Sequence, residues 1–140
     1  MADTPRTMKL KLVTPERVVF ESEAQSVTAM TLEGQITVLP HHSSLISVLS
    51  PGEIIVRHAK QTEPIVVSGG FLEVANNAVT ILADTAEFVH ELDIERAKKA
   101  VELAQSLIRE KKFDVREYET LKTNLDKHRV RVSAFTKWRK

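Results

Sequence analysis

The chain has 140 residues, enough for one ordinary domain or two small ones, and 42% of them are hydrophobic. It contains no cysteine, which excludes disulfides and thiolate chemistry, and no apolar run approaches the roughly 18 residues that cross a bilayer. The net charge of +1 is unevenly placed: residues 111–140 hold ten Lys or Arg against four Asp or Glu and carry +6, which leaves −5 for the first 110 residues. A basic C-terminal segment predicts an acidic partner surface. Residues 1–8 lack the apolar core of a signal peptide, which favours a cytosolic setting.

The pattern of residues 8–86 predicts a β structure. Residues 8–12 alternate between apolar and polar side chains, as a half-buried strand does. Ser50-Pro51-Gly52 and Asn76-Asn77 are typical of turns between strands. Further strands are expected at 18–20, 25–31, 35–39, 45–49, 53–58, 65–67, 71–75 and 78–82. Many short strands at close spacing favour a sandwich or a barrel.

From Asp93 onward the pattern becomes helical. Asp93 is a good N-cap, and Glu95 follows in the first turn, where the helix dipole favours an anion. Apolar residues then recur at steps of three and four, which predicts an amphipathic helix. They are Ile94, Ala97, Val101, Ala104 and Ile108.

A second helix is predicted after the interruption at Lys111-Lys112-Phe113. Asp114 and Glu117 resemble a capping box that restarts a helix. Its apolar stripe consists of Tyr118, Leu121, Leu125, Val132 and Phe135. Two helices joined by a short loop are expected to lie antiparallel. The predicted domains are therefore a β domain at 1–88 and a helical hairpin at 89–140.

Residues with sharper chemistry are few. His41-His42 has no Cys, Asp or Glu at ligand spacing, which favours turn histidines over a metal site, and the same histidines are the only bases near Ser43-Ser44. Gly69-Gly70 lacks the pattern of a phosphate loop and is better explained as a turn or bulge. Neither a catalytic residue nor a metal ligand is predicted.

Five short motifs in this order resemble the epsilon subunit of the bacterial F-type ATP synthase. The resemblance runs from about residue 9 to the C-terminus, and departs at Thr37, His41 and Ser44, where the family usually has Gly, Gly and Pro. The motifs are Val13-Thr14-Pro15-Glu16 with Val19-Phe20, residues 34–45, Leu49-Ser50-Pro51-Gly52, Ser68-Gly69-Gly70-Phe71-Leu72-Glu73-Val74, and Val79-Thr80-Ile81-Leu82-Ala83-Asp84.

The resemblance implies both an architecture and a role. It implies an N-terminal β-sandwich of ten strands followed by the helical hairpin. It also implies a non-catalytic rotor subunit of the central stalk, coupling proton-driven rotation to ATP synthesis at the cytoplasmic face of the plasma membrane. The implied partners are the gamma subunit and the c-ring, and, through the C-terminal helices, the alpha and beta subunits of the catalytic head. The hairpin of bacterial members can extend and block ATP hydrolysis, and association with the membrane is expected only through the complex.

The resemblance also suggests a regulatory ATP site, with no cofactor required. Some bacterial epsilon subunits bind ATP through a motif that resembles Leu92-Asp93-Ile94-Glu95-Arg96-Ala97, together with a glutamate six residues before the aspartate, here Glu87. Lys127 and Arg131 match two basic residues of the second helix, whereas Leu103 stands where tight binders have arginine. The resulting hypothesis is weak ATP binding through Glu87, Asp93, Arg96 and Arg131. The alternative is that Asp93 only caps the helix and Arg96 pairs with a nearby carboxylate.

Two other classes of protein fit parts of the sequence. A free-standing nucleotide-sensing β-sandwich would bind ATP without belonging to a rotary complex. A nucleic-acid-binding β module would use the basic final helix, although Trp138 is the only aromatic residue among its distal charges and no groove-reading motif is present. We therefore expect no nucleic-acid partner.

Overall fold

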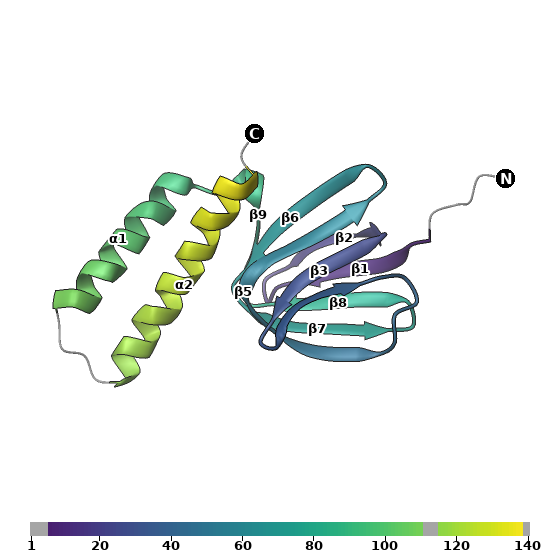
Figure 1. Ribbon diagram of the computed structural model, residues 1–140, viewed down its shortest axis with the longest axis horizontal. Helices are drawn as coiled ribbons and strands as arrows, with labels where there is room; N and C mark the ends of the chain where they lie inside the picture. The colour runs from purple at the N-terminus through teal and green to yellow at the C-terminus, as the bar shows by residue number, and fades with distance from the viewer. Residues whose placement is uncertain (1–5, 111–114, 139–140) are drawn as a thin grey trace. The chain divides into compact units, whose positions relative to one another are not determined.

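The computed structural model describes residues 6–110 and 115–138. It divides into two compact units, Met1–Phe88 and Val89–Lys140. The first unit consists of strands and the second of helices (Figure 1). The predicted order, a β structure followed by two helices, is confirmed.

The β unit contains nine strands in the described residues, all in one connected sheet. They are β1 (Met8–Val13), β2 (Val18–Ala24), β3 (Ser26–Thr31), β4 (Gly34–Val38), β5 (Leu45–His58), β6 (Gln61–Val67), β7 (Gly70–Ala75), β8 (Ala78–Ala83) and β9 (Ala86–Phe88). Strands β1 and β8 pair in parallel, and every other pair is antiparallel.

The sheet curls through β5 into two layers (Figure 1). One layer runs β2-β1-β8-β7 to the first part of β5, and the other runs β4-β3 to the second part of β5, then β6 and β9. The rings of Phe20 on β2 and Phe88 on β9 meet edge to face, with centroids 5.8 Å apart. This contact joins the two layers at the side away from β5, which makes the unit a β-sandwich.

The bend lies at Ser50-Pro51-Gly52, where the sequence predicted a turn between two strands. That prediction is wrong, because the segment is a bulge inside β5: Met30 of β3 alone faces the four residues between Leu49 and Ile54. Proline has no backbone N–H and cannot donate a hydrogen bond to a neighbouring strand. Pro51 is tolerated here because a bulge leaves residues out of the regular pairing. A Cβ on Gly52 would lie 3.1 Å from that of Met30, so the glycine allows the close approach.

The expectation of ten strands is also wrong, since the described residues form nine. Segments 45–49 and 53–58 belong to a single strand, β5. A strand that the sequence analysis did not predict, β9, pairs with the edge of β6 and places Phe88 opposite Ile65. Three residues, Ala-Glu-Phe, are too short to show alternation, so only the free edge of β6 defines this strand.

The core of the β unit lies between the layers and follows the alternation of the strands. On β1, β7 and β8 every second residue is buried, as the sequence predicted. The largest fully buried side chains are Leu10, Leu12, Val27, Val38, Ile54, Ile65, Leu72, Val74, Val79 and Ile81. The predicted hairpin at Asn76-Asn77 is confirmed, because both residues have a positive φ and Ala75 pairs with Ala78.

The helical unit consists of a short 3₁₀ helix, η1 (Val89–Glu91), and the helices α1 (Ile94–Glu110) and α2 (Val115–Trp138). The two α-helices run antiparallel and side by side (Figure 1), and η1 packs against α2. The buried residues that the structure describes in this unit are Val89, Ala97, Ala104, Leu125 and Ala134. Tyr118, predicted within the stripe of α2, is exposed, and the predicted capping residue Asp114 lies outside the described residues.

Candidate functional site

The four predicted nucleotide-binding residues lie in both units. Glu87 is half-buried on β9, opposite Val66 of β6. Asp93 and Arg96 are exposed at the start of α1, and Arg131 is half-buried on α2. Within the hairpin, the first turn of α1 and the last part of α2 lie at the same end (Figure 1). Three of the four residues are therefore carried by one end of the hairpin.

Asp93 acts as a helix cap. Its Oδ1 accepts a hydrogen bond from the backbone N–H of Arg96 at 3.1 Å, and the N–H of Ala97 donates to its carbonyl oxygen at 3.1 Å. These are the contacts that capping requires. Capping thus accounts for Asp93 in this structure, and nucleotide binding by the same carboxylate stays a prediction.

Arg131 has a defined partner on its own helix. Its Nη1 lies 3.0 Å from Nδ1 of His128, one helical turn earlier. A guanidinium only donates hydrogen bonds, so Nδ1 of His128 must be the acceptor. This histidine was absent from every sequence prediction, although it stands within the stripe of α2.

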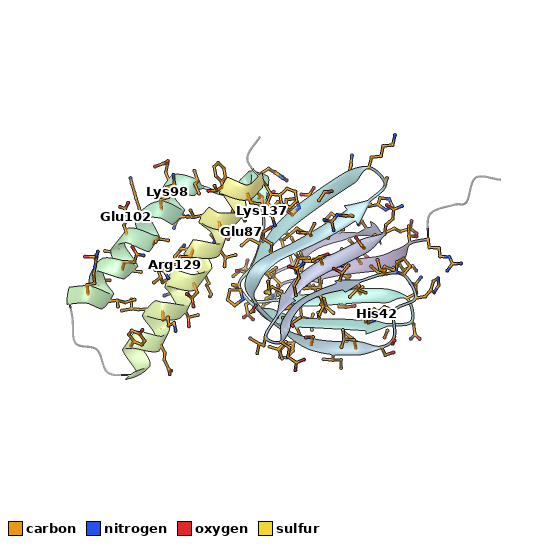
Figure 2. All side chains as sticks on the ribbon, viewed as in Figure 1. His42, Glu87, Lys98, Glu102, Arg129 and Lys137 are labelled. Carbon is orange, nitrogen blue, oxygen red and sulfur yellow. The ribbon has the colours of Figure 1, made fainter. Side chains whose placement is uncertain are left out.

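The two residues proposed as turn histidines have local roles. His41 has φ 65°, and the N–H of His42 donates to the carbonyl of Leu39 at 3.1 Å, closing a turn with Pro40 at its second position. His42, which is labelled in Figure 2, has its ring atom Nδ1 2.8 Å from the Ser43 carbonyl oxygen. In the part of the chain that the structure describes, no three His, Cys, Asp or Glu side chains are grouped to hold a metal.

Asn77 ties three segments of the β unit together. Its Oδ1 accepts from the backbone N–H of His41 at 2.8 Å, and its Nδ2 donates to the carbonyl of Thr7 at 3.0 Å. The N–H of Lys9 donates to its backbone carbonyl at 3.2 Å. The β7–β8 turn thereby holds the start of β1 and the β4–β5 loop. The sequence indicated a turn here but gave no sign of these distant partners.

An apolar row crosses the outer face of the first layer. Cross-strand neighbours place Val48 beside Phe71, Phe71 beside Leu82, Leu82 beside Val13, and Val13 beside Val18. Phe71 and Leu82 are 54% and 53% exposed, respectively. The signal in the sequence was Phe71 itself, because alternation buries Leu72 and Val74 and so turns a large aromatic side chain outward.

The surroundings of the apolar row make it an interaction surface. Ile46, two residues before Val48, is 75% exposed and extends the row along β5. The next row of the same face holds Glu73, Lys11 and Glu21, all exposed. Contiguous exposed apolar side chains rimmed by charges are typical of protein–protein interfaces. The outer face of this layer is therefore the candidate docking surface.

The helical unit presents charge in place of an apolar face. Lys98 and Glu102 on α1, and Arg129 and Lys137 on α2, are exposed (Figure 2). In the described segments no helix is long and apolar enough to span a membrane. A sandwich with an exposed apolar row, joined to a charged helical hairpin, is typical of the interaction-module class of proteins.

Comparison with known proteins identifies the family. Residues 7–89 match the model of the β-sandwich domain of the ATP synthase delta/epsilon chain. The ATP synthase epsilon chain of Moorella thermoacetica is 44% identical over 106 residues, covering 75% of this chain and 79% of the relative. That of Nitratidesulfovibrio vulgaris (strain DP4) is 36% identical over 132 residues, covering 92% and 98%. The chain belongs to the family of ATP synthase epsilon chains.

The alignments with solved structures of the same fold cover both units of the chain. A chain in the Euglena gracilis mitochondrial ATP synthase, described as OSCP/F1/c-ring, has a TM-score of 0.82 and 24% identity, covering 95% of this chain and 84% of that chain. A chain in the central stalk/c-ring of the Tetrahymena thermophila enzyme has a TM-score of 0.68 and 18% identity, covering 95% and 99%. These likenesses describe the fold.

Proposed function

We propose that this chain is the non-catalytic rotor subunit of an F-type ATP synthase and couples proton-driven rotation to ATP synthesis. The observation that carries the proposal is family membership across almost the whole chain: a 36% identical epsilon chain is covered over 98% of its length, hairpin included. The structural relatives come from assemblies described as F1/c-ring and central stalk/c-ring. The expected location is the cytoplasmic face of the plasma membrane, reached through the complex.

The apolar row is the proposed contact with the gamma subunit and the c-ring. Burying exposed apolar surface against a partner contributes roughly 25 cal/mol of binding free energy per Å². Because permanent interfaces are the more hydrophobic ones, such a row favours a permanent partner. The charged row with Glu73, Lys11 and Glu21 would fix the orientation of docking, because charges at a rim add specificity more than affinity.

The decisive experiment is a pull-down of the tagged chain from solubilised membranes. Recovery of gamma together with the catalytic subunits supports a rotor subunit, and recovery of neither contradicts it. Phe71→Ser should lose the partners while the sandwich stays folded. Leu39→Ser is the matched control, since Leu39 is 55% exposed but follows β4 in the other layer.

The hairpin is the proposed brake on ATP hydrolysis, acting on the alpha and beta subunits. The +6 carried by residues 111–140 supports an acidic partner surface. Deletion of residues 92–140 should raise the ATPase activity of the assembled enzyme and leave coupling largely intact. Unchanged or lower hydrolysis in the deletion would contradict an inhibitory hairpin.

Weak binding of regulatory ATP through Glu87, Asp93, Arg96 and Arg131 is part of the proposal. Calorimetric titration of the isolated chain tests it, and no heat at millimolar ATP would exclude it. Asp93→Ser keeps a capping side chain and removes the carboxylate, so it separates the two roles of Asp93. A loss of binding in Asp93→Ser with an intact hairpin supports a ligand role, whereas unchanged binding leaves Asp93 as a cap alone.

A further inference from the structure

The strand connections of the β-sandwich gather at two ends of the unit (Figure 1). The start of β1, the β2–β3 link, the β4–β5 loop and the β5–β6 and β7–β8 turns form one end, which we name the turn end. The β1–β2 and β3–β4 turns, the bulge of β5 and the two links between the layers form the crossover end. The turn end comprises residues 6–7, 25, 39–44, 57–62 and 76–77, and the crossover end comprises residues 14–17, 32–34, 50–53, 68–70 and 84–85.

The two ends carry opposite charge. The crossover end contains four Asp or Glu and one basic residue, Arg17. Its acidic residues are Glu16, Glu33, Glu53 and Asp84. The described segments of the turn end contain no Asp or Glu, but three Arg or Lys and three of the five histidines of the chain, all exposed. These six residues are Arg6, His41, His42, Arg57, His58 and Lys60.

The carboxylates on the strands next to the turn end do not pair with its cations. Glu23 lies opposite Lys9 of β1, and Glu63 lies opposite Val56 of β5. Among the residues that the structure describes, no ion pair joins Arg57 or Lys60 to a carboxylate. The positive charge of these two side chains is therefore available to a partner.

Hydrogen bonds between distant segments hold the turn end together. Oδ1 of Asn77 accepts from the N–H of His41 at 2.8 Å, and its Nδ2 donates to the carbonyl of Thr7 at 3.0 Å. The N–H of Gln25 donates to the carbonyl of Arg57 at 2.7 Å, which ties the β2–β3 link to the β5–β6 hairpin. The exposed basic side chains are therefore carried by backbone segments that are fixed relative to one another.

Backbone strain is also found at the turn end. All the described residues other than glycine that have a positive φ belong to its connections, namely His41, Ala59, Asn76 and Asn77. At the crossover end, the residues with a positive φ are glycines, which adopt this conformation readily. Asparagine tolerates it too, whereas His41 and Ala59 are strained. Strained residues cluster at functional sites, which indicates a role for the exposed imidazole of His41.

One large apolar side chain accompanies the cations of the turn end. Leu39 is 55% exposed and lies two residues before His41. Anionic membrane surfaces are bound by cations together with exposed apolar side chains that enter the headgroup region. The described segments of the turn end contain no Phe, Tyr or Trp on which the bases of a nucleic acid could stack. Lipid headgroups therefore fit this surface better than a nucleic acid does.

We propose that the turn end is a binding surface for anionic lipid headgroups. Arg57 and Lys60 attract the headgroups, and Leu39 enters the headgroup region beside His41 and His42, the latter labelled in Figure 2. The acidic crossover end faces away from the lipid, because an anionic surface repels it. The proposal rests on the membrane location in the proposed function, since only a chain held near the membrane meets this surface.

Site-specific fluorescence of the isolated full chain tests the contact, because the chain contains no cysteine of its own. Ser43→Cys places an environment-sensitive fluorophore at the turn end, and Leu32→Cys places it at the crossover end, both at exposed positions. Vesicles of equal parts phosphatidylglycerol and phosphatidylcholine at low ionic strength should shift the emission of the Ser43→Cys label to the blue and leave the Leu32→Cys label unchanged. Pure phosphatidylcholine should shift neither. No shift at residue 43, or equal shifts at both positions, would overturn the proposal.

Two charge variants of the Ser43→Cys chain separate the turn end from net charge. Each Lys or Arg near an anionic membrane strengthens binding about fivefold, so Arg57→Gln with Lys60→Gln should raise the lipid concentration at half-maximal shift about 25-fold. Lys98→Gln with Arg129→Gln is the matched control, because it removes two exposed cations from the helical unit (Figure 2). It should leave that concentration nearly unchanged. Equal increases in both variants would assign the binding to net charge and contradict the proposal.

The vesicle measurement and the pull-down fail independently. The vesicle measurement needs no other subunit, so its failure removes the lipid contact and leaves recovery of gamma and the catalytic subunits as the test of the rotor role. A failed pull-down with an intact shift at residue 43 would keep the lipid contact and remove the rotor role.

Discussion

The β unit and the helical unit are held together by different kinds of core. Among the described residues, the ten largest fully buried side chains all belong to the β unit, and all are Leu, Ile or Val. Of the five buried residues that are described in the helical unit, three are alanines. Since burial stabilises by roughly 0.8 kcal/mol per CH₂ group, the hairpin gains far less than the sandwich. The proposed docking unit can be rigid, whereas a hairpin proposed to switch must have two conformations of similar free energy.

Leu72→Ala should have the largest effect on this contrast. Leu72 is fully buried between the layers, so truncation should lower the free energy of unfolding of the β unit by about 2–5 kcal/mol. Hydrogen exchange of the strand amides measures the loss. Phe71→Ala is the control next to it in sequence and should cost about 1 kcal/mol or less, since its side chain faces solvent. If Phe71→Ala lowered the free energy of unfolding as much as Leu72→Ala, the side chain of Phe71 would not be facing solvent.

Leu125→Ala should open the hairpin and spare the sandwich. Leu125 is the largest buried residue of α2, and its truncation should cost about 2–3 kcal/mol, near the lower end of such core changes. The urea transition of Trp138 fluorescence should move to lower concentration, while strand protection stays the same. A parallel loss in both units would show that they unfold as one.

Asp93→Ala should destabilise the first turn of α1 by about 1 kcal/mol, because the Arg96 N–H loses its acceptor. Hydrogen exchange of the first-turn amides is the measurement. Asp93→Ser should recover most of the loss. If the serine variant is as unstable as the alanine variant, the carboxylate acts through its charge more than through the cap.

His41→Gly should give the smallest effect and the opposite sign. His41 adopts φ 65°, which costs a residue with a Cβ about 1–2 kcal/mol, while glycine's extra freedom in the unfolded chain offsets part of the gain. We expect a net stabilisation of about 0.5 kcal/mol in thermal unfolding of the β unit. Ser43 lies in the same loop and does not have a positive φ, so Ser43→Gly should not stabilise the β unit.

Local patterns were enough to predict the elements but not their partners. Alternation identified the strands around Leu10, Leu72 and Ile81, and Asn76-Asn77 marked its hairpin, because these signals come from neighbouring residues. The bulge at Ser50-Pro51-Gly52 looks like a turn locally. The pairing of Leu49 with Thr31 and of Ile54 with Ala29, on either side of the bulge, keeps it inside one strand. Strand β9 likewise exists because β6 offers it a free edge.

The candidate sites also divide into features with a local sequence signal and features that depend on the fold. The sequence marked Asp93 as a cap, and the structure shows that contact. It missed His128, since a polar residue does not register in an apolar stripe, and the hydrogen bond to Arg131 appears only on the folded helix. The partners of Asn77, at Thr7 and His41, are distant in the chain and could not be found from local spacing.

By itself, the sequence determined the order of the two units, the inward and outward faces of most strands, and the family resemblance that the comparisons bear out. These follow from periodicity and short motifs, which act over a few residues. Tertiary structure decided where the sheet bends, which outward side chains line up as the apolar row, and which partner His128 holds. Those features depend on contacts between distant strands or on the packing of two helices, and such contacts exist only after the chain has folded.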